Sequence, residues 1–345
     1  MTESQMNPQE VPPNPLDPSA DSDSLPNQAP APPPFLAEPV IFLRAADLSA
    51  PPAYRPSMAW PAVLFVLTLA STTMAGFFYF SGFLAASGKG DFPEGILGSL
   101  ISGLPYAFAV MGILLAHEMG HFLACRYYQL ASTYPYFIPF PLLSIAGTMG
   151  AFIRIRTPFR NTRQLFDVGI AGPLLGYLFA LPALVIGMIA SNLTVLEPDT
   201  EGLIFFGEPL IFKMVAHLVF PHYNEAAETI NLHPIGWAAW FGIFATSINL
   251  LPMGQLDGGH IVYALFGPVW HRRFSIAFCA GLVALSAFTW SPAYLVFGAL
   301  VYFLGLKHPT LMEPGTISGQ GRRWLALLAL IIFLLSFVPV PVYMK

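Results

Sequence analysis

Residues 97–125 read LGSLISGLPYAFAVMGILLAHEMGHFLAC, a run with one acidic side chain and no lysine or arginine. A helix needs about 20 mainly apolar residues to cross the hydrocarbon core of a bilayer, so this run is long enough to span a membrane. Its ionisable residues, His117, Glu118 and His121, are grouped near one end. Ionisable side chains at membrane depth are costly, and this cluster is therefore a candidate functional site.

The composition of the whole chain also indicates a membrane protein. Of the 345 residues, 55% are hydrophobic and only 10% are charged, whereas soluble domains carry about 25% charged residues. Both cysteines, Cys125 and Cys279, lie in apolar stretches, which excludes a disulfide framework and a cysteine-based zinc site. The net charge of −4 gives no reason to expect a nucleic acid partner.

Apolar blocks beyond the quoted run predict further membrane helices. We expect an all-α polytopic membrane protein with about six to seven transmembrane helices, a small membrane-dipping β element after the 97–125 helix, and the lipid bilayer as its environment. The expected spans are about 58–80, 97–125, 165–190, 235–252, 274–289, 291–306 and 324–343. The loop between the third and fourth expected spans, at about 191–234, is acidic.

The distribution of cations predicts the orientation in the membrane. With seven spans, twelve of the 15 lysines and arginines fall on one side, which the positive-inside rule assigns to the cytoplasm together with the N-terminus. A bacterial cytoplasmic membrane is the default location. Residues 1–56 are rich in proline and polar side chains and cannot bury enough apolar surface to fold, so we predict a disordered cytoplasmic tail. The membrane domain then covers residues 57–345.

The cluster near the end of the quoted run has the pattern HExxH. Residues four apart share a face of a helix, so His117 and His121 can present two imidazoles to one cation. Zinc suits imidazole ligands, and Glu118 is placed to take a proton from an activated water. The alternative is a cluster at a helix end that merely meets the membrane interface close to Arg126.

The best candidate for a third metal ligand is Asp257, within the stretch NLLPMGQLDGGH at residues 249–260. In the predicted topology this stretch and the HExxH pattern lie toward the cytoplasmic ends of their helices and share a depth. Its proline and glycines break the helix, and irregular backbone at membrane depth is tolerated only where it lines a cavity or packs within protein. Taken alone, Asp257 also fits a turn or N-cap aspartate at the interface.

Together, His117–His121, Asn249 with Pro252, and Leu256–His260 resemble the site-2 proteases, which are intramembrane zinc metalloproteases. The resemblance continues through AGP at residues 171–173 and covers a catalytic core of about 97–270 within 57–345. Among the site-2 proteases the chain resembles a compact form without a PDZ domain, because the loop at about 191–234 is too short to hold one.

The resemblance implies an endopeptidase that cleaves transmembrane segments of membrane-anchored proteins. It implies one zinc ion per chain on His117, His121 and Asp257, with Glu118 as the general base. It further suggests that Asn249 positions substrate or stabilises the oxyanion.

A substrate helix must unwind before its peptide bonds can be attacked, and an extended strand can then pair with an exposed edge of the enzyme. Residues 133–156 are suited to this because their prolines prevent a helix and residues 150–156 have a strand pattern. In the family, this position resembles a membrane-dipping β element beside the active site. An ordinary interfacial hairpin anchored by aromatic residues is the alternative.

Two other classes of protein could use the same cluster. A metal-ion transporter or channel would use it as a transit site, but should show polar residues stepping along several spans, and the other spans are almost uncharged. A prenyl-protein type of HExxH protease should have a glutamate as third ligand, and Glu118 is the one glutamate within an expected span. The substrate, the oligomeric state and a contact between His260 and the metal are not determined by these motifs.

Overall fold

The computed structural model describes residues 56–88, 95–141, 144–195, 204–224, 227–289, 311, 313 and 319–344. The chain divides into two units, Met1–Ala53 and Tyr54–Lys345, and every described residue belongs to the second. Apart from Pro56, the predicted disordered tail lies outside the described residues, as does the predicted span at 291–306.

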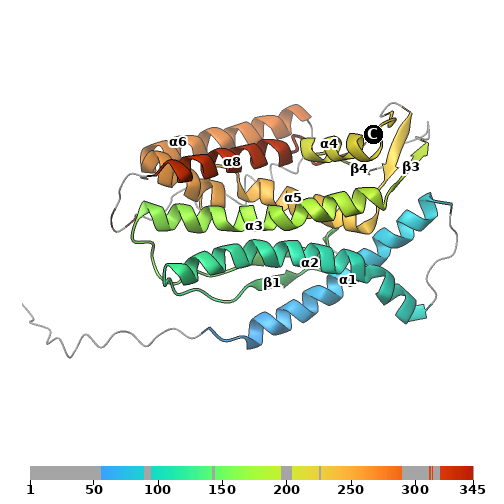
Figure 1. The fold of residues 1–345 in the computed structure, drawn as a ribbon, viewed down its shortest axis with the longest axis horizontal. Coiled ribbons are helices and arrows are strands. Elements are labelled where there is room, and N and C mark those ends of the chain that lie inside the picture. Colours follow the sequence, from blue (N-terminus) through green and yellow to red (C-terminus); the bar gives the residue numbers. More distant parts are fainter. Residues whose placement is uncertain are drawn as a thin grey trace, which may run out of the picture. The chain divides into compact units, whose positions relative to one another are not determined.

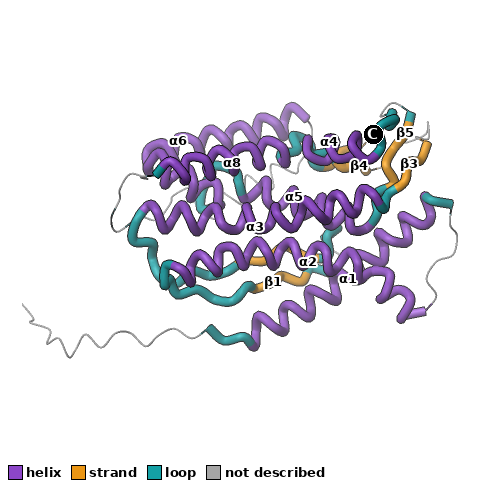
Figure 2. The backbone as a smooth tube through the Cα atoms, viewed as in Figure 1, coloured by secondary structure: helices purple, strands orange, loops and turns teal. Residues whose placement is uncertain are grey.

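Most of the described residues are helical, and short strands connect some of the helices (Figures 1 and 2). The elements in chain order are α1 (Ala59–Ala86), α2 (Gly95–Tyr127), β1 (Tyr136–Pro139), β2 (Thr148–Phe152), α3 (Thr162–Ile189), β3 (Asn192–Val195), β4 (Ile204–Phe206), α4 (Leu210–Val219), β5 (Glu228–Asn231), α5 (Pro234–Asn249), α6 (Asp257–Thr289), α8 (Gln320–Ser336) and β6 (Val342–Met344).

Four helices among the described residues, α1, α2, α3 and α6, are long and apolar enough to cross a membrane. The chain is thus a polytopic helical membrane protein, as predicted, and its described residues contain four candidate spans where about six to seven were expected for the whole chain. The 16 residues of α5 and the 17 of α8 correspond to about 24–26 Å at 1.5 Å per residue, less than the hydrocarbon thickness of about 30 Å. The span expected at 274–289 is the second part of α6, which bends at Gly267 (φ 80°).

The predicted β element follows α2. Strands β1 and β2 pair antiparallel, with Tyr136 opposite Phe152 and their rings stacked at a centroid distance of 5.6 Å. The Thr148 hydroxyl donates a hydrogen bond to the Ile138 carbonyl at 2.9 Å. This hairpin packs against α1 and also contacts α2 through β2. The strand expected at 150–156 is found at Thr148–Phe152, so it begins two residues earlier and ends four residues earlier than predicted. Beyond its end, Ser132 and Ile155 form an isolated bridge.

Helix α3 lies beside α2 and α5 and contacts α6 and α8 as well (Figure 1). The helices approach closely where glycine replaces a side chain, as is common between membrane helices. A Cβ atom at Gly120 would lie 2.3 Å from the Ala171 carbonyl oxygen, and one at Gly187 would lie 2.2 Å from the Gly236 nitrogen. Close backbone contacts therefore join α3 to both α2 and α5.

A charged contact attaches α8 to α3. The Arg322 guanidinium donates from Nε to Asp167 Oδ1 at 2.8 Å and from Nη2 to Asp167 Oδ2 at 2.6 Å. The Tyr128 hydroxyl donates to the same carboxylate. Both charged side chains are about three-quarters covered. Two parallel hydrogen bonds between arginine and carboxylate give a stronger and more directional contact than a single ion pair.

We expect Arg322→Ala to lower the free energy of unfolding by about 1–3 kcal/mol, because it leaves the Asp167 carboxylate without its charged donors. Unfolding of the purified protein in detergent measures the change. The control is Arg323→Ala, since Arg323 is the exposed neighbour on α8. Equal losses in the two variants would contradict a specific role for the Arg322 contact.

Candidate metal centre

Two imidazoles from α2 face each other in the interior of the protein. His117 and His121 are only 5% and 8% exposed, and their Nε2 atoms lie 3.2 Å apart. Their spacing of four residues puts both rings on one face of the helix. The structure therefore brings together the two histidines of the HExxH pattern as the sequence predicts.

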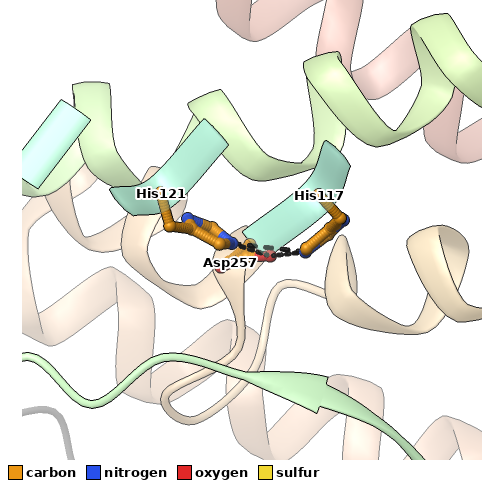
Figure 3. A group of neighbouring side chains, drawn as sticks. All are labelled: His117, His121 and Asp257. Atoms are coloured by element: carbon orange, nitrogen blue, oxygen red, sulfur yellow. Dashed lines mark hydrogen bonds and ion pairs between the residues drawn. The ribbon is translucent and has the colours of Figure 1, made fainter. Parts of the chain in front are cut away.

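Asp257, the first residue of α6, completes the group (Figure 3). Its Oδ2 atom lies 3.2 Å from His117 Nε2 and 3.3 Å from His121 Nε2. One nitrogen from each imidazole and one carboxylate oxygen all lie within 4.8 Å of one another. Two imidazoles and one carboxylate in this arrangement fit the ligand set of a catalytic zinc site, which keeps a further position for water.

The path of the chain between α5 and α6 brings Asp257 to the histidines. A Cβ atom at Gly258 would lie 2.0 Å from the Leu250 carbonyl oxygen, and one at Gly259 would lie 2.5 Å from the Gly254 oxygen. The first turn of α6 is thus pressed against the preceding loop, which only glycine allows. The predicted helix break is confirmed, and Leu250, Leu251 and Met253 within it are buried in the protein.

Helix α3 orients the imidazoles although it supplies none of the three clustered side chains. The Val168 carbonyl accepts a hydrogen bond from His121 Nδ1 at 2.7 Å, so Nε2 of that ring keeps its lone pair toward Asp257. A Cβ atom at Gly172 would lie 2.1 Å from His121 Nε2, and one at Gly176 would lie 3.0 Å from the His117 Cβ. The two glycines leave the space that the two rings occupy.

The relation of Gly172 and Gly176 to the two histidines was not predicted from the sequence. The signal was present, because the glycines are four residues apart, as are His117 and His121. Val168 contributes through its backbone carbonyl. Its side chain therefore gives no indication in the sequence that the residue contacts His121.

Glu118 lies beside the cluster and is only 6% exposed. Its carboxylate interacts electrostatically with both imidazoles and with Asp257, and it accepts a hydrogen bond from the backbone of Ile153. Ile153 directly follows β2. The Glu118 carboxylate is therefore close both to the three clustered side chains and to the β hairpin.

Asn249 ends α5, and its side chain reaches the same cluster. The Nδ2 atom lies 3.3 Å from His117 Nε2, which places an amide donor next to one of the three clustered atoms. The five predicted site residues are thus gathered from the ends of three helices, α2, α5 and α6.

The other histidines that the structure describes lie outside the cluster. Among the described residues, the cluster is the one group of three potential metal ligands. His260 packs against Phe159, with ring centroids 6.1 Å apart. His233 caps the N-terminus of α5 by accepting from the Ile235 amide, and His217 contacts Tyr223. His271 precedes two arginines in the sequence but is only 2% exposed, so it does not belong to a positively charged surface.

The fold and the cluster define a polytopic membrane protein with a buried HExxH helix and an aspartate from a second helix. The chain belongs to Peptidase family M50, whose family model matches residues 105–289. The resemblance to site-2 proteases is thereby confirmed.

Curated relatives of the chain include plant proteins. One is "Probable zinc metalloprotease EGY1, chloroplastic" of Arabidopsis thaliana, 31% identical over 250 residues, or 69% of this chain and 43% of the relative. Another is "Probable zinc metalloprotease EGY2, chloroplastic" of Oryza sativa subsp. japonica, 30% identical over 217 residues, or 61% and 36% of the two chains. The chain spans less than half the length of these relatives. Their chloroplast location conflicts with the expected bacterial membrane.

Proposed function

We propose that the chain is an intramembrane zinc endopeptidase that cleaves transmembrane segments of membrane-anchored proteins. The observation that carries the proposal is the convergence of His117, His121 and Asp257 with the Glu118 carboxylate beside them in helices long enough to span a membrane. The family match and the names of the relatives support the same activity. The protease domain is then 57–345, with its catalytic core at about 97–270, and the Pro-rich segment 1–56 is a tail.

In this proposal one zinc ion per chain is held by His117 Nε2, His121 Nε2 and an oxygen of Asp257. A bound zinc ion supplies Lewis acidity, which polarises a carbonyl group and makes water a stronger nucleophile at neutral pH. The hydrogen bond from His121 Nδ1 to the Val168 carbonyl supports this assignment, because it fixes the tautomer that a metal ligand requires.

The reaction requires a proton to move from the attacking water to the leaving amine. Glu118 is the general base that takes this proton, and as the C–N bond breaks it returns the proton to the amine nitrogen. Its burial keeps bulk water from competing for the proton. Asn249 is proposed to donate its amide hydrogen to the carbonyl oxygen of the scissile bond, because this donor lies next to the metal ligands.

A transmembrane substrate must be unwound before it is cleaved, and the β hairpin can hold the unwound segment. The backbone of Ile153 contacts Glu118, so a peptide paired along this side of the hairpin would pass close to the general base. Met149 and Phe152 on β2 are exposed and can contact apolar side chains of the substrate. An interfacial hairpin with a purely anchoring role would not require this proximity to Glu118.

The proposal also assigns an orientation. Five arginines gather where α2 ends and α3 begins, next to the end of α2 that carries the HExxH pattern: Arg126 is in the last turn of α2, Arg154, Arg156 and Arg160 are in the connection, and Arg163 is in the first turn of α3. By the positive-inside rule, this end of α2 and the N-terminus of the chain face the side of the membrane from which the protein is inserted during synthesis. Water then reaches the cluster from that side.

The family match favours the protease over a metal transporter or channel. The proximity of an aspartate carboxylate to both imidazoles distinguishes the site from a prenyl-protein type of protease, which should use a glutamate.

We expect purified wild-type protein in detergent to bind one zinc ion per chain and to lose cleavage of a model transmembrane substrate when zinc is chelated. We expect Asp257→Asn to weaken zinc binding by about 100-fold or more, because a neutral amide replaces the anionic ligand. Zinc competition with a fluorescent chelator measures the affinity.

The matched control is Asp167→Asn, which makes the same chemical change at the Arg322 contact. It should reduce stability without changing the affinity for zinc. Wild-type protein that binds no zinc, or wild-type affinity in Asp257→Asn, would overturn the proposed ligand set.

A further inference from the structure

The loop that carries Asp257 is held at one point by two side chains from far along α6. The backbone amide of Gly254 donates to Ser275 Oγ at 3.1 Å, and its carbonyl accepts from His271 Nε2 at 2.9 Å. Both backbone groups of one loop residue are thereby bound by side chains 17 and 21 residues away. Gly254 has a φ of +56°, so the loop turns at this residue in a conformation that favours glycine.

His271 and Ser275 are placed for this contact by the shape of α6. The helix bends at Gly267, four residues before His271. The two residues are four apart and share a face of the helix, and they are 2% and 0% exposed. Burial of a polar side chain is costly unless it is hydrogen-bonded. The cost is offset here by the two bonds to Gly254.

The position of Gly254 is coupled to that of Asp257 three residues later. The Leu256 amide donates to the Met253 carbonyl at 3.3 Å, which closes the turn around Gly254. Gly259 faces the Gly254 oxygen so closely that an added Cβ would lie 2.5 Å from it. The loop cannot shift at Gly254 without moving the first turn of α6, where Asp257 lies 3.2 Å from His117 Nε2.

We propose that His271 and Ser275 are positioning residues that hold Asp257 in the geometry needed to bind the metal, a proposal that rests on the zinc site proposed above. They act on Asp257 through their hydrogen bonds to the Gly254 turn. Loss of hydrogen-bonded groups behind metal ligands commonly costs 10–100-fold in metal affinity. The second part of α6 therefore belongs to the metal site as well as to the membrane-spanning scaffold.

The test measures zinc and cobalt binding by the full-length protein in detergent. Ser275→Ala removes the acceptor with little change in volume, and His271→Leu removes the donor. We expect zinc affinity to fall about 10-fold in the first variant and about 10–100-fold in the second. The absorption spectrum of bound cobalt should change in both, because the ligand geometry changes. His271→Gln keeps an N–H donor and should restore most of the affinity.

The matched control is Ser286→Ala, the same substitution at a buried position further along α6. It should leave zinc affinity and the cobalt spectrum unchanged even if its thermal stability falls. If Asp257→Asn loses zinc but Ser275→Ala and His271→Leu both bind zinc with wild-type affinity, the positioning role is overturned. If Asp257→Asn also binds zinc normally, the proposed metal site itself is wrong, and the positioning role fails with it.

Discussion

Glu118→Gln is expected to reduce the rate of substrate cleavage by about 10²–10⁴-fold, the range typical of a lost general base. Glutamine has almost the same shape but cannot take a proton from water. The ligand atoms belong to His117, His121 and Asp257, so the variant should bind zinc as tightly as the wild type. Cleavage of a model transmembrane substrate and zinc stoichiometry, measured on the same preparation, separate the two effects.

Glu228→Gln is the control for this experiment, because Glu228 lies in β5 and not in the site. It should cleave at the wild-type rate. Cleavage by Glu118→Gln at the rate of the control would sink the general-base assignment. A loss of zinc from Glu118→Gln would instead indicate that this carboxylate is part of the ligand set.

Gly172→Ala is expected to weaken zinc binding and to reduce activity strongly, although the change adds a single methyl group. That methyl carbon would lie 2.1 Å from His121 Nε2 and within 2.6 Å of two ring carbons. The imidazole cannot move aside without breaking its hydrogen bond to the Val168 carbonyl. We expect a loss of about 1–3 kcal/mol in the free energy of unfolding from overpacking and a fall in zinc affinity beyond 10-fold from the displaced ring.

Gly112→Ala makes the same change in α2, where an added Cβ meets no atom within 4 Å. This control should keep its zinc affinity and be as stable as the wild type or slightly more so, since alanine favours helix over glycine. Zinc titration and unfolding in detergent distinguish the two variants. If Gly172→Ala bound zinc like Gly112→Ala, the space around His121 could not be as tight as the structure indicates.

The site could be predicted from the sequence because its chemistry depends on rare side chains. Histidine, glutamate and aspartate at membrane depth need partners, and their motifs specify which ones. The predicted group of His117, His121 and Asp257 is the group that the structure assembles, with Glu118 and Asn249 beside it. The catalytic roles remain proposals that the substitutions above test.

The number of spans was harder to predict because hydropathy does not show where a helix starts or bends. Helix α6 begins at Asp257 and bends at Gly267. It therefore contains both the end of the motif at 249–260 and the span predicted at 274–289. His271 stands beside two arginines in sequence, as exposed residues often do, yet its side chain is buried. The side chain is buried because it lies on the face of α6 that packs against the Gly254 loop. Which face packs there is decided by tertiary structure and not by the neighbouring residues in sequence.

The glycines of α3 determine what would be needed to transplant this site. A designer who grafted the HExxH helix alone onto another bundle would bring the imidazoles without the surface that accommodates them. Gly172 and Gly176 supply that surface by the absence of side chains, and Val168 adds the carbonyl that sets one tautomer. The smallest portable unit is therefore the interlocked pair α2 and α3, to which a host scaffold must add the aspartate.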